Sequence, residues 1–260
     1  MLLVIDVGNT HTVIGLFQAS ELLVHWRVTT HPERTADEFG VLLRDLFGNQ
    51  SFRMEDVQAI TVSCVVPPLL PALEEVSHRF FGVDPLVVGP GIRTGLPILA
   101  DNPREVGADR IVNAVAGIAQ YGPPLIIVDF GTATTFDAIS REGEYLGGAI
   151  APGISISLDA LFEHAAKLPR VELIRPEQAI GRNTISSMQS GILFGYVGLV
   201  KEMVTRIAKE LGGNPRVIAT GGGAELVARE TGLIDRVDPF LTLEGLRLIH
   251  ERNLNTDGHE

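Results

Sequence analysis

Short apolar runs alternate along the chain with longer segments whose apolar positions recur at helical spacing. Leu2–Ile5 and Val13–Phe17 are two such runs separated by a polar turn, which predicts a strand, a tight turn and a second strand. Residues 35–47 repeat their apolar positions with a helical period, and Thr35 and Glu38 form a possible capping box at the start of that helix. The same criteria predict strands at 59–65, 85–88, 125–128, 136–139 and 216–219, and helices at 69–80, 104–121, 186–211 and 224–230. This alternation predicts the α/β class with mixed sheets flanked by helices, because hairpin strands pair antiparallel.

The strand–turn–strand pattern occurs twice. Residues 5–12 and 128–135 both read D-x-G-x-x-x-T, and the matched positions are Asp6, Gly8 and Thr12 in the first copy and Asp129, Gly131 and Thr135 in the second. Nearly half of the 260 residues separate the copies. The repeat predicts two similar domains, residues 1–117 and 118–260, that face each other across a cleft.

The repeated turn has the chemistry of a phosphate site. A turn between strands exposes successive backbone N–H groups, and a glycine lets a phosphate approach the main chain. Threonine and asparagine side chains add hydrogen bonds, and an aspartate at the strand end can hold Mg²⁺ or another cation. Alternatively, Asp and Gly only shape two hairpins. The occurrence of two copies favours a polyphosphate held by both loops.

Other nucleotide-binding signatures are missing or ambiguous. The chain has no G-x-x-x-x-G-K-[ST] motif and no G-x-G-x-x-G after a strand. Asp129-Phe130-Gly131 spells the D-F-G of protein kinases, but no H-R-D motif accompanies it, so we interpret it as accidental. Gly221–Gly223 follows a predicted strand and either lets an adenine or ribose lie against the backbone or forms a simple turn. The scattered histidines give no metal-ligand spacing.

Composition narrows the classes of partner. With 21 basic and 32 acidic residues the net charge is −11, which argues against nucleic acid or an anionic membrane as partner but not against ATP. Cys64 is the only cysteine, lies in an apolar run and is expected to be a buried, inert thiol. The N-terminus lacks the pattern of a signal peptide, and no apolar stretch approaches the roughly 20 residues of a membrane span. We therefore expect a cytoplasmic protein, with a polar tail from Glu251 that frays.

Charged residues gather at 101–110, beside the predicted helix 104–121. Asp101 and Asn102 have the character of helix caps. Asp109 and Arg110 lie where the chain becomes apolar, and are either a buried ion pair or a base beside a substrate clamp. The sequence alone leaves both interpretations open.

Several motifs together resemble those of the type III pantothenate kinases. In the order typical of that family, over roughly residues 2–250, the chain has Asp6-Val7-Gly8-Asn9-Thr10, Asp101-Asn102-Pro103, Gly107-Ala108-Asp109-Arg110, Asp129-Phe130-Gly131-Thr132-Ala133-Thr134-Thr135, Gly147-Gly148, Pro152-Gly153, Ala166-Lys167-Leu168-Pro169 and Gly181-Arg182-Asn183-Thr184. The resemblance implies duplicated ribonuclease-H-like domains of the actin-like ATPase type, with ATP in the interdomain cleft. It also implies an ATP-dependent phosphotransferase that phosphorylates the terminal hydroxyl of pantothenate, the first step of coenzyme A biosynthesis.

The resemblance also implies residue roles. Asp109 would accept the proton, and Asp129 would hold a monovalent cation, K⁺ or NH₄⁺, in addition to the Mg²⁺ that accompanies ATP. The ATP-binding residues would be Asp6, Val7, Gly8, Asn9, Thr10, His11, Thr12, Val13 and Thr132. The pantothenate-binding residues would be Gly107, Ala108, Asp109, Arg110 and Thr184. Members of the family are homodimers.

One position departs from the family pattern. A tyrosine that contacts the substrate usually precedes Asp-Asn-Pro, whereas this chain has Ala100. Loss of an aromatic contact would weaken pantothenate binding by about 1–3 kcal/mol, unless another side chain fills the gap.

Three questions stay open at this level. Gly191, Gly195 and Gly198 fall on about one face of the predicted helix 186–211, which is typical either of close packing in the core or of a dimer seam. The acceptor could be another small hydroxyl compound, because fold alone does not select it. A non-catalytic ATP-responsive regulator would need the phosphate loops but not Asp109 or Arg110, so the presence of both favours the enzyme.

Overall fold

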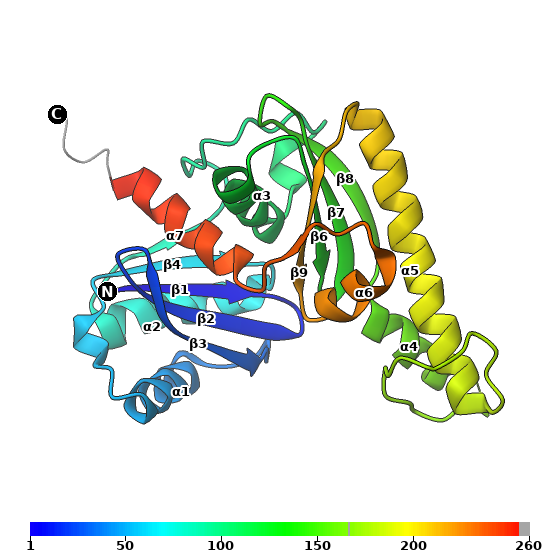
Figure 1. The fold of residues 1–260 in the computed structure, drawn as a ribbon. Coiled ribbons are helices and arrows are strands. Elements are labelled where there is room, and N and C mark those ends of the chain that lie inside the picture. The colour runs from blue at the N-terminus through cyan, green and yellow to red at the C-terminus, as the bar shows by residue number, and fades with distance from the viewer. Residues whose placement is uncertain (166, 255–260) are drawn as a thin grey trace. The chain divides into compact units, whose positions relative to one another are not determined.

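The computed structural model describes residues 1–165 and 167–254, which form two compact units (Figure 1). The first unit contains Met1–Leu96, Asn102–Ala116 and the chain from Leu241 onward, and the second contains Pro97–Asp101 and Gly117–Phe240. Within the described ranges, no helix is both long and apolar enough to span a membrane.

The first unit is built on a five-stranded mixed sheet of order β3-β2-β1-β4-β5. Its strands are β1 (Leu2–Val7), β2 (His11–Gln18), β3 (Glu21–Thr29), β4 (Ala59–Cys64) and β5 (Pro85–Val87). β1, β2 and β3 pair antiparallel, whereas β4 is parallel to β1 and β5 is parallel to β4. The predicted hairpin and the predicted strands that follow it are therefore confirmed.

Helices cover both faces of this sheet. α1 (Ala36–Asn49) and α2 (Leu70–Val76) bury Phe39, Leu43 and Leu73 against one face. α7 (Leu241–Leu254) contacts β1, β2 and β4. α1 begins where predicted, because the Thr35 side chain accepts the Glu38 N–H and the Glu38 carboxylate accepts the Thr35 N–H at 2.9 Å, which is a complete capping box.

The second unit repeats the architecture with the order β10-β9-β6-β7-β8. Its strands are β6 (Leu125–Phe130), β7 (Ala133–Ile139), β8 (Tyr145–Pro152), β9 (Arg216–Gly221) and β10 (Arg236–Val237). Its helices are α4 (Ile154–His164), α5 (Thr184–Leu211) and α6 (Ala224–Thr231), while α3 (Ala108–Tyr121) crosses the boundary between the units. Leu193, Val197 and Val200 of α5 pack with Phe136 and Val128 in the core of this unit.

The two sheets have the same strand order and the same strand directions, so β1 to β5 correspond to β6 to β10. This confirms the predicted duplicated α/β fold with mixed sheets. The equivalence also includes β3, β8 and β10, which the hydrophobic pattern did not predict. β3 has no fully buried residue, β8 has one and alternates between exposed and half-buried positions, and β10 has only two residues, so none of them shows a clear apolar run.

The alignment of the repeat needs one correction. Asp6 lies opposite Val13 on β2, whereas Asp129 lies opposite Thr135 on β7. The first turn is thus one residue longer than the second. By strand register the counterpart of Thr12 is Thr134 and not Thr135.

Three other boundaries differ from the sequence prediction. The division near residue 117 falls beside the observed boundary, but α7 packs with the first unit although its residues belong to the predicted domain 118–260. The predicted helix 104–121 begins only at Ala108, because Pro103–Glu105 forms a separate 3₁₀ turn capped by Asn102. The expected fraying from Glu251 is wrong for residues 251–254, which continue α7, while 255–260 and Ala166 lie outside the described residues.

Candidate functional site

The turn between β1 and β2 is held by hydrogen bonds on both of its sides. The Gly8 N–H donates to the His11 carbonyl at 3.0 Å, and Thr30 donates through its hydroxyl to the Gly8 carbonyl at 2.8 Å and through its N–H to the Thr10 carbonyl at 3.0 Å. Asn9 and Thr10 are exposed at the tip. The turn therefore presents Asn9, Thr10 and their backbone to solution on a fixed frame.

The buried residues of the predicted ATP loop have a structural role. Val7 is fully buried and Thr12 is 1% exposed, with its hydroxyl 2.9 Å from the Thr30 hydroxyl. His11 Nδ1 lies 2.9 Å from Arg27 Nη2, and burial, followed by the positive charge of Arg27, lowers the pKa of His11. At neutral pH the His11 side chain is therefore a neutral partner of Arg27.

Asp6 lies beside the same turn. It is half-buried in β1, opposite Val13 on β2 and Ser63 on β4. Burial raises the pKa of the neighbouring Cys64 thiol, and the charge of Asp6 raises it further, while the hydrogen bond to the Val66 carbonyl acts in the opposite direction. The half-buried Cys64 is therefore a weak nucleophile, in keeping with the expected inert thiol.

The second turn, between β6 and β7, is tighter and braced by a glycine. The Gly131 N–H donates to the Ala133 carbonyl at 3.0 Å, and the Gly153 N–H donates to the Thr132 carbonyl at 3.0 Å. A Cβ atom at Gly153 would overlap the Thr132 carbonyl. Position 153 therefore requires glycine for Thr132 to keep its place, a role that the sequence motif Pro152-Gly153 did not reveal.

Asp129 lies beside the second turn, in space that stays open because two of its neighbours, Gly131 and Gly221, are glycines. Its Oδ1 atom lies only 2.6 Å from the place of a Cβ on Gly221, and 3.8 Å from that of Gly131. Thr135 on β7 and Thr220 on β9 lie directly opposite Asp129 on the two adjacent strands. The structure thus brings a carboxylate and two hydroxyl groups to one place, since cross-strand neighbours share a face.

The side-chain donor atoms gathered at Asp129 are all oxygens, which fits a hard cation. Hard cations take oxygen ligands from carboxylates, hydroxyls and carbonyls. Over residues 1–165 and 167–254, no group of three His, Cys, Asp or Glu side chains is close enough to hold a metal ion.

Gly107–Arg110 forms the start of α3. Asp109 Oδ1 accepts the Arg110 N–H at 2.9 Å, and a Cβ on Gly107 would lie 2.5 Å from the same oxygen. Burial raises the pKa of Asp109, while the hydrogen bond from the Arg110 N–H and the charge of Arg110 act in the opposite direction. Asn102 caps the preceding 3₁₀ turn, as expected of a cap, and donates to Glu105 at 2.6 Å.

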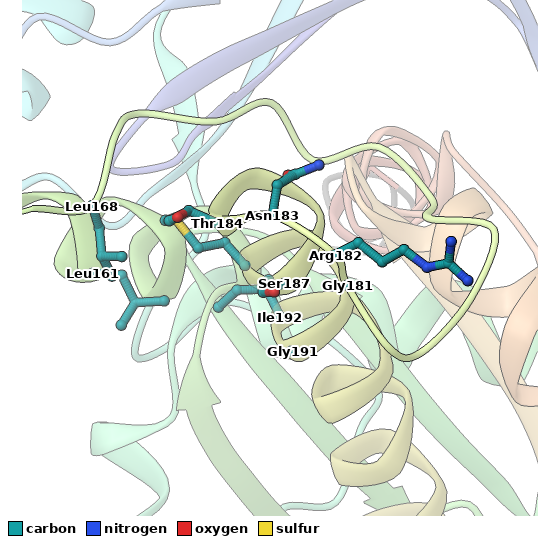
Figure 2. A pocket seen from close by; sticks show the side chains of 10 residues that line it. Leu161, Leu168, Gly181, Arg182, Asn183, Thr184, Ser187, Gly191 and Ile192 are labelled. Atoms are coloured by element: carbon teal, nitrogen blue, oxygen red, sulfur yellow. The ribbon is translucent and has the colours of Figure 1, made fainter.

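Thr184 lines a cavity of about 750 Å³ between α4, α5 and the segment before α5 (Figure 2). The cavity is amphipathic, with Arg182, Asn183, Thr184 and Ser187 as its polar residues and Leu161, Leu168, Met188 and Ile192 among its apolar ones. Figure 2 shows Leu161 and Leu168 together on one side, with the Arg182 side chain extending away from them. Apart from Thr184, no role is predicted for these residues from the sequence, because a cavity wall built from two helices has no local signature.

Asn183 fixes the start of α5 at this cavity. Its Oδ1 accepts the Ser186 N–H at 2.9 Å, and the Ser186 hydroxyl accepts the Asn183 N–H at 3.3 Å. These bonds form a capping box that sets the position of Thr184 at the first turn of the helix.

Comparison with solved structures identifies the class of the fold. A putative Baf family transcriptional activator from Campylobacter jejuni superposes with a TM-score of 0.62 at 21% identity, covering 97% of this chain and 99% of that one. MreB 5 of Spiroplasma citri, bound to AMPPNP, superposes with a TM-score of 0.55 at 11% identity, covering 98% and 97%. At these identities the likeness concerns the fold alone. The two mixed sheets of this chain, with their common strand order, therefore have the same fold as these solved structures.

Sequence comparison identifies the family. Residues 2–206 match the type III pantothenate kinase family. A type III pantothenate kinase of Geobacter sulfurreducens is 59% identical over 253 residues, which cover 97% of this chain and 99% of the relative. That of Moorella thermoacetica is 57% identical over 253 residues, covering 97% and 100%. The chain belongs to the type III pantothenate kinase family.

Proposed function

We propose a set of residue roles by which this chain carries out the reaction of its family. As a type III pantothenate kinase, it transfers the γ-phosphate of ATP to the terminal 4′-hydroxyl of pantothenate, the first step of coenzyme A biosynthesis. The observation that carries this function is the 59% identity to a type III pantothenate kinase across nearly the whole of both chains.

The two glycine turns bind ATP in this proposal. Asp6–Val13 contacts the phosphates, with Asn9, Thr10 and the backbone of Gly8 as the contacting groups, and Thr132 contacts ATP from the second turn. Support comes from the exposure of Asn9 and Thr10 on a hydrogen-bonded frame and from the bracing of Thr132 by Gly153. Mg²⁺ accompanies ATP and offsets charge on the phosphates.

Asp109 acts as the general base. It takes the proton from the 4′-hydroxyl as that oxygen forms a bond to the γ-phosphorus, while the bond from the γ-phosphorus to the bridging oxygen of ADP breaks. A raised pKa supports the role, because a base is most effective when its pKa approaches the working pH. Arg110, with the backbone of Gly107 and Ala108, holds the acceptor.

The amphipathic cavity at Thr184 receives part of the acceptor. Pantothenate combines hydroxyl, amide and carboxylate groups with a dimethyl-substituted carbon, so it needs polar and apolar surface together. The walls of the cavity offer both, with Thr184 and Asn183 beside Met188 and Ile192.

Asp129 holds the monovalent cation, K⁺ or NH₄⁺. The cation supplies positive charge near the phosphates, and the packing of Asp129 over Gly221 supports a fixed position for its ligand. We also place the enzyme in the cytoplasm, where ATP is available.

The chain forms a homodimer in this proposal. Gly191, Gly195 and Gly198 are exposed on α5, and an added Cβ at any of them meets no atom of the described chain within 4 Å. The helix face that carries these three glycines is therefore not packed in the core. Of the two interpretations, core packing and a dimer seam, the exposure favours a seam with a second copy.

A coupled ADP-release assay tests the function. We expect ADP release that depends on pantothenate and is stimulated by K⁺ relative to choline at equal ionic strength. Slow ATP hydrolysis at a rate independent of pantothenate would instead identify an ATP-responsive regulator. ADP release with another hydroxyl compound but not with pantothenate would identify a different kinase.

A further inference from the structure

A fully buried carboxyl group lies on β7, in hydrogen-bond contact with two hydroxyl groups. The Tyr145 hydroxyl donates to Asp137 Oδ1 at 2.7 Å, and the Thr135 hydroxyl donates to Asp137 Oδ2 at 3.4 Å. Asp137 and Tyr145 are both 0% exposed. Burial of a carboxyl group is costly unless polar partners surround it, so the arrangement needs a physical reason.

The chain of polar groups ends beside Asp129. Thr135 lies directly opposite Asp129 in the β6–β7 ladder, and Asp137 lies opposite Ile127, two residues away on the same face. The intervening Phe136 points to the other face, into the apolar core with α5. Tyr145, Asp137, Thr135 and Asp129 therefore follow one another on a single face of the second sheet.

The duplicated fold provides an internal control. By strand register the counterparts of Thr135 and Asp137 in the first sheet are Val13 and Gly15, opposite Asp6 and Val4. The same hairpin thus forms there without these polar side chains. The buried carboxyl group belongs to the unit that contains Asp129 and is not required by the fold.

A hydroxyl group has one proton to donate and two lone pairs that accept. When Thr135 donates its proton to Asp137, only lone pairs of its oxygen are left for the side of Asp129. A lone pair beside a carboxylate is favourable where a cation is held between them.

We propose that Asp137 and Tyr145 are positioning residues for a monovalent cation site made by Asp129 and the Thr135 hydroxyl. Asp137 orients the Thr135 hydroxyl, and Tyr145 holds Asp137. The inference rests on the proposed cation role of Asp129 and goes beyond it by naming a second oxygen ligand and the buried pair that orients it.

Tyr145 is itself anchored by its main chain. Its N–H donates to the Pro97 carbonyl and its carbonyl accepts the Leu99 N–H, each at 2.8 Å. A phenol fixed in this way keeps the Asp137 carboxyl group in one orientation.

Thermal unfolding in KCl and in choline chloride at equal ionic strength measures the site without turnover. We expect K⁺ to raise the melting temperature of the wild-type protein and Asp129→Asn to abolish that rise. Asp137→Asn, Tyr145→Phe and Thr135→Val should each raise the K⁺ concentration of the half-maximal shift by about 10-fold or more, as is usual for groups that orient metal ligands. The K⁺ concentration that half-activates ADP release should rise in parallel.

Tyr121→Phe is the matched control. It removes a hydroxyl–carboxylate hydrogen bond of 2.8 Å to Asp238 in the same unit, from residues that have no role in the proposed site. We expect it to lower the melting temperature and leave the K⁺ concentration dependence unchanged. If Asp137→Asn does not fold, the K⁺ dependence of the melting temperatures of Tyr145→Phe and Thr135→Val still tests the positioning role.

Two results would overturn the inference in distinguishable ways. If Asp129→Asn abolishes the K⁺ shift but Asp137→Asn, Tyr145→Phe and Thr135→Val keep the wild-type K⁺ dependence, the positioning role is wrong and the cation role of Asp129 stands. If the wild-type protein shows no K⁺ shift, or Asp129→Asn retains it, both assignments fail, while pantothenate-dependent ADP release still decides the kinase activity separately.

Discussion

At the scale of single residues, the buried environment of Asp109 affects both its role as a base and the stability of the folded protein. Burial raises the pKa of Asp109, so between its ordinary pKa and its folded pKa the folded protein binds more protons than the unfolded chain. The free energy of unfolding therefore falls as pH rises through that window. The charged base that the reaction needs is a group that the fold disfavours.

Asp109→Asn should lower kcat by about 10²- to 10⁴-fold, because it removes a general base. The melting temperature near neutral pH should stay the same or rise, since the neutral amide lacks the burial penalty of the carboxylate. Turnover and thermal unfolding measure the two effects. Full activity of the variant would exclude Asp109 from the role.

The acid limb of the pH profile gives a second test of Asp109. A base works only when deprotonated, so kcat/KM should rise with pH through the folded pKa of Asp109, which burial raises from its ordinary value. In Asp109→Asn this limb should disappear. A limb that persists unchanged would assign it to another group.

Gly221→Ala should disturb Asp129, because the new methyl group would lie 2.6 Å from Asp129 Oδ1. We expect activity to fall by about 10²-fold, the usual effect of a small misplacement in an active site. Gly82→Ala is the control. Gly82 also has a positive φ, 69° against 88° for Gly221, but an added Cβ there meets nothing within 4 Å. Gly82→Ala should lose about 1–2 kcal/mol of stability from backbone strain. Gly221→Ala should lose more, because its Cβ would also lie 2.7 Å from the Phe130 carbonyl oxygen, and only this variant should lose activity.

At the scale of secondary-structure elements, two helix starts have the same capping chemistry but different surroundings. Thr35 caps α1, and Asn183 caps α5 beside the cavity of Thr184. The comparison separates what a cap does for stability from what it does for binding.

Asn183→Ala and Thr35→Ala should each lower the free energy of unfolding by about 1 kcal/mol, the usual effect of losing a cap. Only Asn183→Ala should raise the KM for pantothenate, because only its helix start lines the cavity. Urea unfolding and steady-state kinetics measure the two quantities. If both variants had the same KM for pantothenate, the cavity would not be part of the acceptor site.

At the scale of the whole molecule, the exposed glycine face of α5 predicts the oligomeric state. Light scattering after size exclusion should give about twice the chain mass of 28.0 kDa. Gly195→Arg should produce a monomer, because a large charged side chain prevents close helix approach. Gly48→Arg, at another exposed helical glycine with nothing within 4 Å, should remain dimeric. A wild-type mass of 28.0 kDa would reject the dimer.

Elements whose signals are local could be predicted from the order of the amino acids alone. The capping box at Thr35, the two hairpins with Asp6 and Asp129, and the long helix beginning near Thr184 all follow from residues within a few positions of one another. The family motifs added the expected roles of Asp109, Asp129 and Thr184.

Features that depend on residues distant in the sequence became visible only in the folded chain. Strand register showed that Thr134 and not Thr135 corresponds to Thr12. Packing showed that Gly221 leaves room for Asp129 and that α7 belongs with the first sheet. Hydrophobic periodicity records which positions are buried but not which partner buries them, because the hydrophobic effect is non-directional. Pairing between strands and packing between helices supply that information.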